Sequence, residues 1–201
     1  MQLNEAAMQQ LTERGYAIVP QWLAAQTVGH VNQLFSELEF VPAKVGKGEN
    51  LQERPEIRGD STYWINPLVA PFKILSTLEA LENLRLSCNR ELFLGVRDSE
   101  FHLARYPAGA FYRKHNDRHE TSSQRVLSVI VYLNDNWQPS DGGELVIYNP
   151  AHQEIERVLP LGGTMVCFLS ADFPHEVLPS QRERRSLTGW FLTGGSNVLP
   201  L

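Results

Sequence analysis

The chain contains 201 residues, of which 42% are hydrophobic and 20% are charged, and its net charge is −5. This composition is typical of an ordinary folded globular protein, and it argues against a dedicated nucleic-acid or membrane-surface binder. The sequence has no basic, apolar leader and no apolar run of roughly 20 residues, so we expect neither a secretory signal nor a membrane span.

The first half of the sequence predicts mostly helix. Apolar residues recur at helical spacing in residues 4–15, 24–38 and 68–94, and Pro71 interrupts the last of these segments. A short strand is expected at 16–23, between the first two helices.

Residues 43–57, between the second and third helical segments, are polar and rich in glycine and lysine. Connections of that length are usually functional or mobile, so a mobile loop is expected here. The two cysteines, Cys88 and Cys167, share no metal-type spacing, which indicates free thiols in a reducing, cytoplasmic setting.

From about residue 100 onward the pattern changes to short runs rich in valine, isoleucine, leucine and aromatic residues. These runs are 100–107, 125–134, 143–149, 164–169, 175–179 and 184–192. Short strands at near-regular spacing predict a sandwich or barrel. We therefore expect a single α+β domain over residues 1–201, with helical support in residues 1–98 and a β core in residues 99–194.

Residues 111–125, FYRKHNDRHETSSQR, place three metal-ligand residue types at alternate positions: His115, Asp117 and His119. These three could bind a metal locally, the first two could pair with a distant histidine, or the stretch could be a solvated loop. His175 follows a run with the character of a buried strand. Two histidines and one carboxylate form the facial triad of non-haem ferrous oxygenases, which leaves coordination positions open. We favour His115, Asp117 and His175, and expect His119 at the surface near the mouth of the site.

The strand predicted at 184–192 alternates polar and apolar residues. One face carries Arg184, Ser186, Thr188 and Trp190, whereas Arg185 lies on the face of Leu187 and Gly189. An arginine inside a barrel is costly unless it is paired, and its guanidinium suits a carboxylate. The alternative is a surface arginine in a basic strand start. We favour Arg184 as the partner of an anionic, metal-chelating cosubstrate.

Together, His115-x-Asp117, His175 and Arg184 resemble the iron(II)- and 2-oxoglutarate-dependent dioxygenases. Within these, the chain resembles the EGL-nine prolyl hydroxylase group and its small bacterial relatives over about residues 43–191. The stretches that carry this resemblance are IRGDSTYWI (57–65), ARYPAGAFYRKHND (104–117), RVLSVIVYLNDNW (125–137), GGELVIY (142–148) and PHEVLP (174–179).

The resemblance implies a double-stranded β-helix (jelly-roll) core with supporting N-terminal helices, and it implies a role for each matching residue. The iron ligands would be His115, Asp117 and His175. The cosubstrate pocket would contain Arg184, Tyr132, Tyr106, Leu145 and Thr188. The substrate site would contain Asp60 and Arg125 as a charged pair near the bound proline, with Trp190 and Arg58 beside them. The loop 43–57 would close over the substrate.

The implied reaction is the hydroxylation of a prolyl residue in a protein, coupled to oxidative decarboxylation of 2-oxoglutarate to succinate and carbon dioxide. It would use iron(II), 2-oxoglutarate and dioxygen, with ascorbate as a stimulant. For the bacterial relatives, the resemblance suggests elongation factor Tu as substrate, and we expect a cytoplasmic monomer. Two alternatives stay open: a 2-oxoglutarate oxygenase acting on a ribosomal protein or a small molecule, and a non-catalytic, cupin-like metal-binding module.

Overall fold

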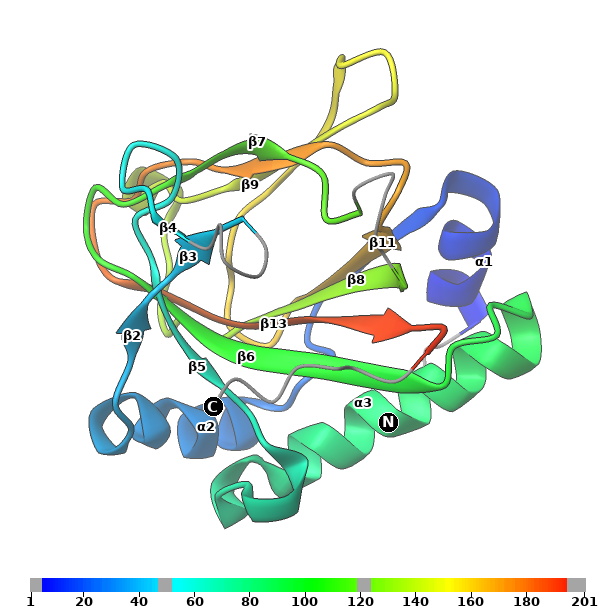
Figure 1. Cartoon of the computed structure of the whole chain (residues 1–201), viewed down its shortest axis with the longest axis horizontal. Coiled ribbons are helices and arrows are strands. Elements are labelled where there is room, and N and C mark those ends of the chain that lie inside the picture. The colour runs from blue at the N-terminus through cyan, green and yellow to red at the C-terminus, as the bar shows by residue number, and fades with distance from the viewer. Residues whose placement is uncertain (1–4, 47–51, 119–123, 195–201) are drawn as a thin grey trace.

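The computed structural model describes residues 5–46, 52–118 and 124–194, and two antiparallel β-sheets packed face to face form its centre (Figure 1). The larger sheet contains, in spatial order, β1 (Tyr16–Val19), β11 (Met165–Leu169), β8 (Arg125–Tyr132), β13 (Arg184–Leu192), β6 (Asp98–Tyr106), β5 (Ser61–Trp64) and β2 (Val41–Pro42). The smaller sheet contains β10 (Glu154–Val158), β9 (Leu145–Tyr148), β12 (His175–Val177) and β7 (Tyr112–His115). This architecture confirms the predicted double-stranded β-helix core.

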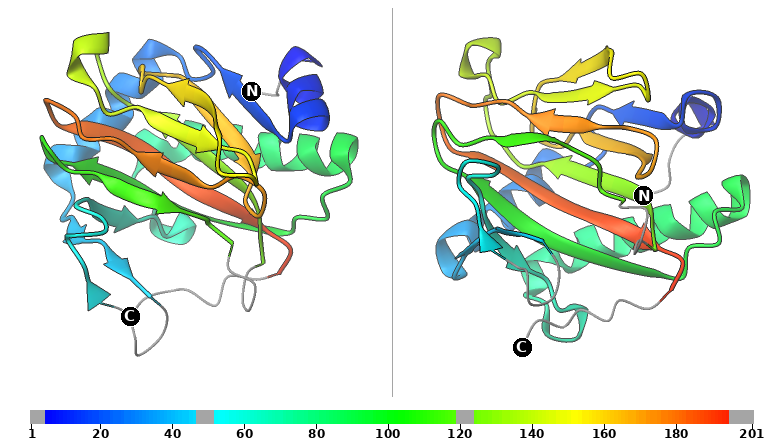
Figure 2. Two further views of the ribbon diagram at one scale, coloured as in Figure 1. Left: turned by 90° about the horizontal axis from the view of Figure 1, so that it is seen from above. Right: turned by 45° about the horizontal axis from the view of Figure 1, so that its top comes forward.

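Three helices cover the outer face of the larger sheet (Figure 2). They are α1 (Glu5–Arg14), α2 (Ala25–Glu37) and α3 (Phe72–Leu92). Their buried apolar residues, among them Leu34 of α2 and Leu84 of α3, join Leu103, Val129 and Leu187 of the sheet in the main hydrophobic core. Among the described residues, no helix combines the length and the apolar character that a membrane span requires.

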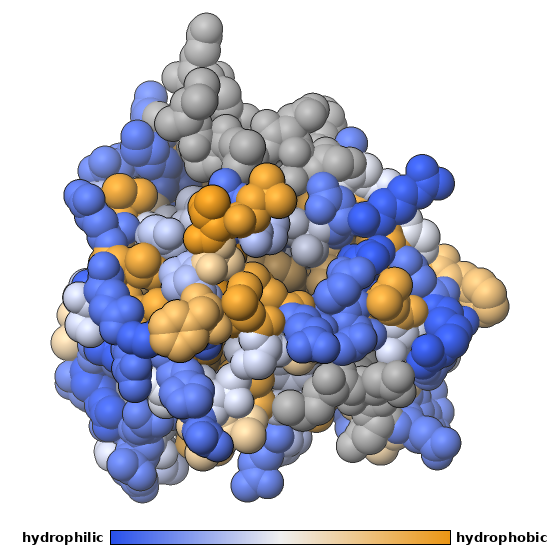
Figure 3. Space-filling model, turned by 90° about the horizontal axis from the view of Figure 1, so that it is seen from below, coloured by the Kyte–Doolittle hydropathy of each residue, from blue (hydrophilic) through white to orange (hydrophobic). Residues whose placement is uncertain are grey.

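The surface on the helix side of the molecule is not uniformly polar. In the space-filling view from that side, hydrophobic residues gather near its middle (Figure 3). Around the start of α3, Leu68, Val69 and Phe72 are 88%, 75% and 78% exposed. Pro71 precedes α3 directly and separates it from a short 3-10 turn at Pro67–Val69, as the interruption at this proline predicted.

A second, smaller apolar cluster lies between the two sheets. It includes Tyr106, Tyr132 and Ile130 of the larger sheet and Leu145 and Ile147 of the smaller one. Neighbouring residues on the central strands therefore point to opposite sides, one set toward the helices and the other into the barrel.

Six strands of the described chain were not predicted, namely β2, β5, β7, β10 and the two short strands β3 (Lys44–Val45) and β4 (Gln52–Glu53). Both β7 (YRKH) and β10 (EIERV) are polar edge strands of the smaller sheet, so neither shows the apolar run that marks a buried strand. The strand expected at 16–23 ends at Val19, because Gln21 has a left-handed backbone conformation with φ 53°. Within the expected loop at 43–57, β3 pairs with β4, and residues 47–51 lie outside the described residues.

Candidate metal centre

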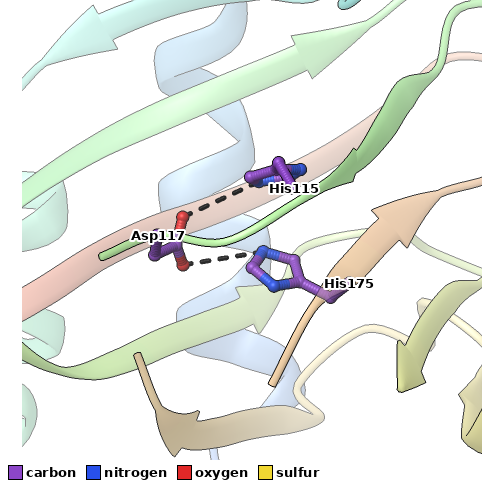
Figure 4. Close-up of side chains that lie close together, drawn as sticks. All are labelled: His115, Asp117 and His175. Atoms are coloured by element: carbon purple, nitrogen blue, oxygen red, sulfur yellow. Dashed lines mark ion pairs between the residues drawn. The ribbon is translucent and has the colours of Figure 1, made fainter. Parts of the chain in front are cut away.

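His115, Asp117 and His175 converge between the two sheets (Figure 4). His115 ends β7 and His175 begins β12, and the two are direct partners across these antiparallel strands. The Asp117 carboxylate lies beside both rings, with Oδ1 3.7 Å from Nε2 of His115 and Oδ2 3.5 Å from Nε2 of His175. All three donor atoms lie within 4.8 Å of one another, a spacing at which one ion can contact them all.

An irregularity in the pairing of β7 with β12 brings His115 into this position. Val177 pairs with Tyr112 and His175 with His115, so two steps on β12 match three steps on β7. Such a bulge lets residues at odd spacing face the same side of a strand. The rings of Tyr112 and His115 accordingly stack, with centroids 3.6 Å apart and an interplanar angle of 17°.

Backbone contacts fix the tautomers of both imidazoles. Nδ1 of His115 lies 2.8 Å from the carbonyl oxygen of Arg113, and Nδ1 of His175 lies 3.0 Å from that of Phe173. A carbonyl oxygen only accepts hydrogen bonds, so each Nδ1 carries the proton and each Nε2 keeps a free lone pair. Both Nε2 atoms are therefore prepared to bind a metal.

Burial and the neighbouring His175 lower the pKa of His115 to about 3, so that this ring is neutral at physiological pH. Burial alone would raise the pKa of Asp117, but His175, His115 and a hydrogen bond from Ser128 bring it down to about 2. The site thus offers two imidazoles and one carboxylate, the donor set of a non-haem ferrous centre.

Two serines that were not predicted support the carboxylate. Ser128 Oγ donates to Asp117 Oδ2 at 2.7 Å and also lies 2.9 Å from Ser170 Oγ. Because the Ser128 proton points to Asp117, the Ser170 hydroxyl donates to Ser128. The only sequence signal was a serine at an inward position of the apolar run VLSVIVY.

Arg184 is buried inside the same barrel, at the start of β13, and is only 2% exposed. Its Nε donates to the carbonyl of Gly143 at 2.9 Å, and its guanidinium carbon lies 5.1 Å and 5.2 Å from the ring centroids of Tyr132 and Tyr106. Within the described parts of the chain, no carboxylate pairs with this cation. A buried guanidinium without an anionic partner suits a ligand carboxylate.

The two tyrosines beside Arg184 are equally buried. Burial raises the pKa of Tyr132 to about 12 and that of Tyr106 further still, so both phenols stay protonated. The Tyr132 hydroxyl lies near Arg184, but it forms no full hydrogen bond with any described residue, which leaves it able to donate to a ligand. Leu145 is fully buried in the same cluster, and Thr188 is half-buried with its hydroxyl 3.1 Å from that of Ser186.

Asp60 and Arg125 were expected as one charged pair, but they belong to two different ion pairs. Asp60 is 4% exposed and accepts two hydrogen bonds from Arg58, at 2.7 Å and 2.5 Å. Arg125 donates to Glu100 at 2.9 Å and 2.7 Å, while its guanidinium carbon lies 3.4 Å from the ring centroid of Trp190. His119 lies outside the described residues, so its expected surface position stays a prediction.

Comparison with known proteins agrees with this geometry. Residues 101–192 match the 2OG-Fe(II) oxygenase superfamily. A prolyl-4-hydroxylase of Pseudomonas putida is 41% identical, with a TM-score of 0.82, over 94% of this chain and 98% of that one. A prolyl hydroxylase of Trichoplax adhaerens, solved in complex with a hypoxia inducible factor peptide fragment, is 25% identical, with a TM-score of 0.81, over 93% and 87% of the two chains.

Longer relatives match as well. The hypoxia-inducible factor prolyl hydroxylase of Caenorhabditis elegans is 28% identical over 94% of this chain, and human prolyl hydroxylase EGLN3 is 32% identical over 67% of it. The chain spans 28% and 59% of the length of these two proteins. The donor set fits iron(II). The buried guanidinium of Arg184, which has no carboxylate partner among the described residues, fits the free carboxylate of 2-oxoglutarate. Such oxygenases depend on these two groups and on dioxygen. The chain belongs to the 2OG-Fe(II) oxygenase superfamily.

Proposed function

We propose that this protein hydroxylates a prolyl residue of a protein substrate, using iron(II), 2-oxoglutarate and dioxygen. The observation that carries the proposal is the buried Arg184, which has no acidic partner in the described chain and lies in the same barrel as the metal triad. The Pseudomonas putida prolyl-4-hydroxylase, 41% identical over nearly its whole length, supports proline as the target.

Each residue then has a defined task. His115, Asp117 and His175 hold the iron, Arg184 and Tyr132 bind the distal carboxylate of 2-oxoglutarate, and Tyr106, Leu145 and Thr188 complete the cosubstrate pocket. The bound iron supplies the redox chemistry that couples decarboxylation of 2-oxoglutarate to hydroxylation of a C–H bond. The protein binds and orients the reactants and keeps water away from them.

The groups beside Trp190 are proposed to bind the substrate. Arg125 covers one face of the Trp190 ring, and the Arg58–Asp60 pair lies on the segment that leads into β5. A peptide substrate is supported by the Trichoplax adhaerens protein, whose structure contains a peptide fragment. Residues 43–57, including the β3–β4 hairpin, are proposed to close over such a peptide.

Elongation factor Tu is our proposed protein substrate, on the resemblance to small bacterial relatives of the EGL-nine group. We further propose a cytoplasmic monomer that ascorbate stimulates; two buried, free cysteines agree with a reducing compartment. The alternatives are an oxygenase acting on a ribosomal protein or a small molecule, and a cupin-like binding module without catalysis.

Mass spectrometry of host-lysate proteins tests the proposal. The lysate is treated with the protein, iron(II) and 2-oxoglutarate, and searched for prolines that gain one oxygen atom, with an Arg184→Met variant as control. Prolines modified only by the wild-type protein support prolyl hydroxylation, and elongation factor Tu among them supports the proposed substrate. Modification of another residue type would redirect the assignment. No charge-transfer band on adding iron(II) and 2-oxoglutarate without oxygen would favour the cupin-like module.

A further inference from the structure

His102 is a buried imidazole inside the barrel to which nothing above gives a role. It lies on β6, is 3% exposed, and pairs across the sheet with Thr188 of β13 and Trp64 of β5. Its ring centroid is 4.7 Å from that of Trp64 and 5.7 Å from that of Trp190. The imidazole therefore lies beside Trp190 of the proposed substrate site, with Trp64 as a further aromatic neighbour.

The Nδ1 atom of His102 is buried and has no hydrogen-bond partner in the described chain. Buried polar groups are nearly always hydrogen-bonded, so such an atom requires an explanation. The Tyr132 hydroxyl is also buried without a hydrogen bond, and the proposed function gives it the carboxylate of 2-oxoglutarate. The proposed function gives no partner to Nδ1 of His102.

The strand register separates His102 from Arg184, the residue proposed to bind the distal carboxylate of 2-oxoglutarate. Arg184 pairs with Tyr106, whereas His102 lies four residues away along the same strand, a separation of roughly 13 Å at about 3.3 Å per residue. The charges around His102 agree with this placement. Burial, Arg58 and Arg125 lower its pKa to about 3, against an opposing effect of Asp117. His102 is thus neutral. It lies near Arg58, Arg125 and Trp190 of the proposed substrate site, opposite Thr188 and within the electrostatic reach of Asp117.

We propose that His102 is a substrate-recognition residue whose Nδ1–H donates a hydrogen bond to a backbone carbonyl oxygen of the target prolyl segment. A prolyl residue has no N–H, so its own backbone can only accept hydrogen bonds. A neutral imidazole supplies one N–H donor, and the flanking rings of Trp64 and Trp190 offer an apolar wall to the pyrrolidine ring. This assignment rests on the proposed prolyl hydroxylation, and it adds a residue that would hydrogen-bond to the backbone of the substrate peptide.

The test compares His102→Leu with His102→Asn. Leucine removes the donor, whereas the asparagine side-chain amide can place a donor near the position of Nδ1. The probe is a synthetic peptide spanning the proline found in the lysate experiment. It is titrated without oxygen into protein loaded with iron(II) and 2-oxoglutarate, and binding is followed by tryptophan fluorescence, so that no turnover is involved.

We expect the leucine variant to bind the peptide about five- to tenfold more weakly than the wild type, and the asparagine variant to stay within about twofold of it. Affinity for 2-oxoglutarate, read from the charge-transfer band, should be the same in all three proteins. Equal peptide affinity of the leucine variant and the wild type would overturn the role of His102 and leave prolyl hydroxylation standing. Weaker 2-oxoglutarate binding in the leucine variant would assign His102 to the cosubstrate and also overturn it. A lysate without any hydroxylated proline would remove the proposed function itself, and the inference with it.

Discussion

Replacing Arg184 by methionine removes the one cation that the barrel offers, within the described residues, to the distal carboxylate of 2-oxoglutarate. The arginine is 2% exposed, so its guanidinium is sheltered from bulk solvent. Truncating one partner of a buried, hydrogen-bonded charge pair costs about 2–5 kcal/mol, which weakens binding between about 30-fold and about 5000-fold. The Tyr132 hydroxyl stays in place, so some affinity for the carboxylate should remain.

The assay is an anaerobic titration of the iron(II)-loaded protein with 2-oxoglutarate, followed by the charge-transfer band. Arg185→Met is the matched control, because Arg185 is the next residue of β13 but pairs with Glu183 at 2.7 Å outside the barrel. The control should bind 2-oxoglutarate like the wild type. Unchanged affinity in Arg184→Met would refute the role of Arg184, and an equal loss in both variants would point to a general effect of charge on the strand.

The measured loss of 2-oxoglutarate affinity in Arg184→Met should not arise from a loss of protein stability. Unliganded Arg184→Met loses the hydrogen bond to the carbonyl of Gly143, but it also loses a buried charge that has no anionic partner in the described chain. These two effects on the free energy of unfolding have opposite signs. The melting temperature of the variant without ligands should therefore stay close to that of the wild type.

His175→Ala should abolish iron binding and turnover, whereas His119→Ala should preserve both, because the triad is complete without His119. The iron content of the two variants measures this. The reverse result would favour a local His-x-Asp-x-His site. Ser128→Ala removes the hydrogen bond to Asp117 and should weaken iron affinity about tenfold or more, as measured by competition with a chelator. Equal iron affinity of the variant and the wild type would show that the Ser128 hydroxyl does not support Asp117 as a ligand. His102→Leu should reduce acid destabilisation of the metal-free protein. The pKa of His102 is about 3 in the folded state, so between that value and about 6.5 the unfolded chain binds more protons, and stability falls by about 2 kcal/mol at pH 5. Urea unfolding at pH 7 and pH 5 measures this difference, and an equal pH dependence in variant and wild type would contradict it.

The parts of the site that lie on regular strands could be predicted from the sequence. The alternation in residues 184–192 separates Arg184 from Arg185, and the structure buries the first and leaves the second half-buried. The alternation predicts which arginine is buried because side chains in a strand point alternately to two faces. Here one face packs against the helices and the other faces the barrel interior. The facial triad followed from residue chemistry combined with the family resemblance.

Other features depend on pairings between distant segments, and local sequence does not contain them. The bulge that brings Tyr112 and His115 to the same side exists only because β7 pairs with β12. Arg125 of β8 pairs with Glu100 of β6 because both strands lie next to β13, and the local sequence around Arg125 does not indicate this partner. Ser128 supports Asp117 only because β8 passes beside the end of β7, and its sequence context is simply an apolar run.

The helices contribute none of the proposed iron ligands, yet they help to determine the site through the register of the larger sheet. Leu103 and Leu187 are fully buried against the helices, whereas His102, beside Leu103, and Arg184 point into the barrel. A slip of one residue in either strand would exchange the two faces and press these polar groups into the hydrophobic core. Burying an unpaired charge there costs far more than moving a leucine, so the apolar core holds the strands in one register. The polar interior is therefore a consequence of the apolar packing on the other side of the same strands.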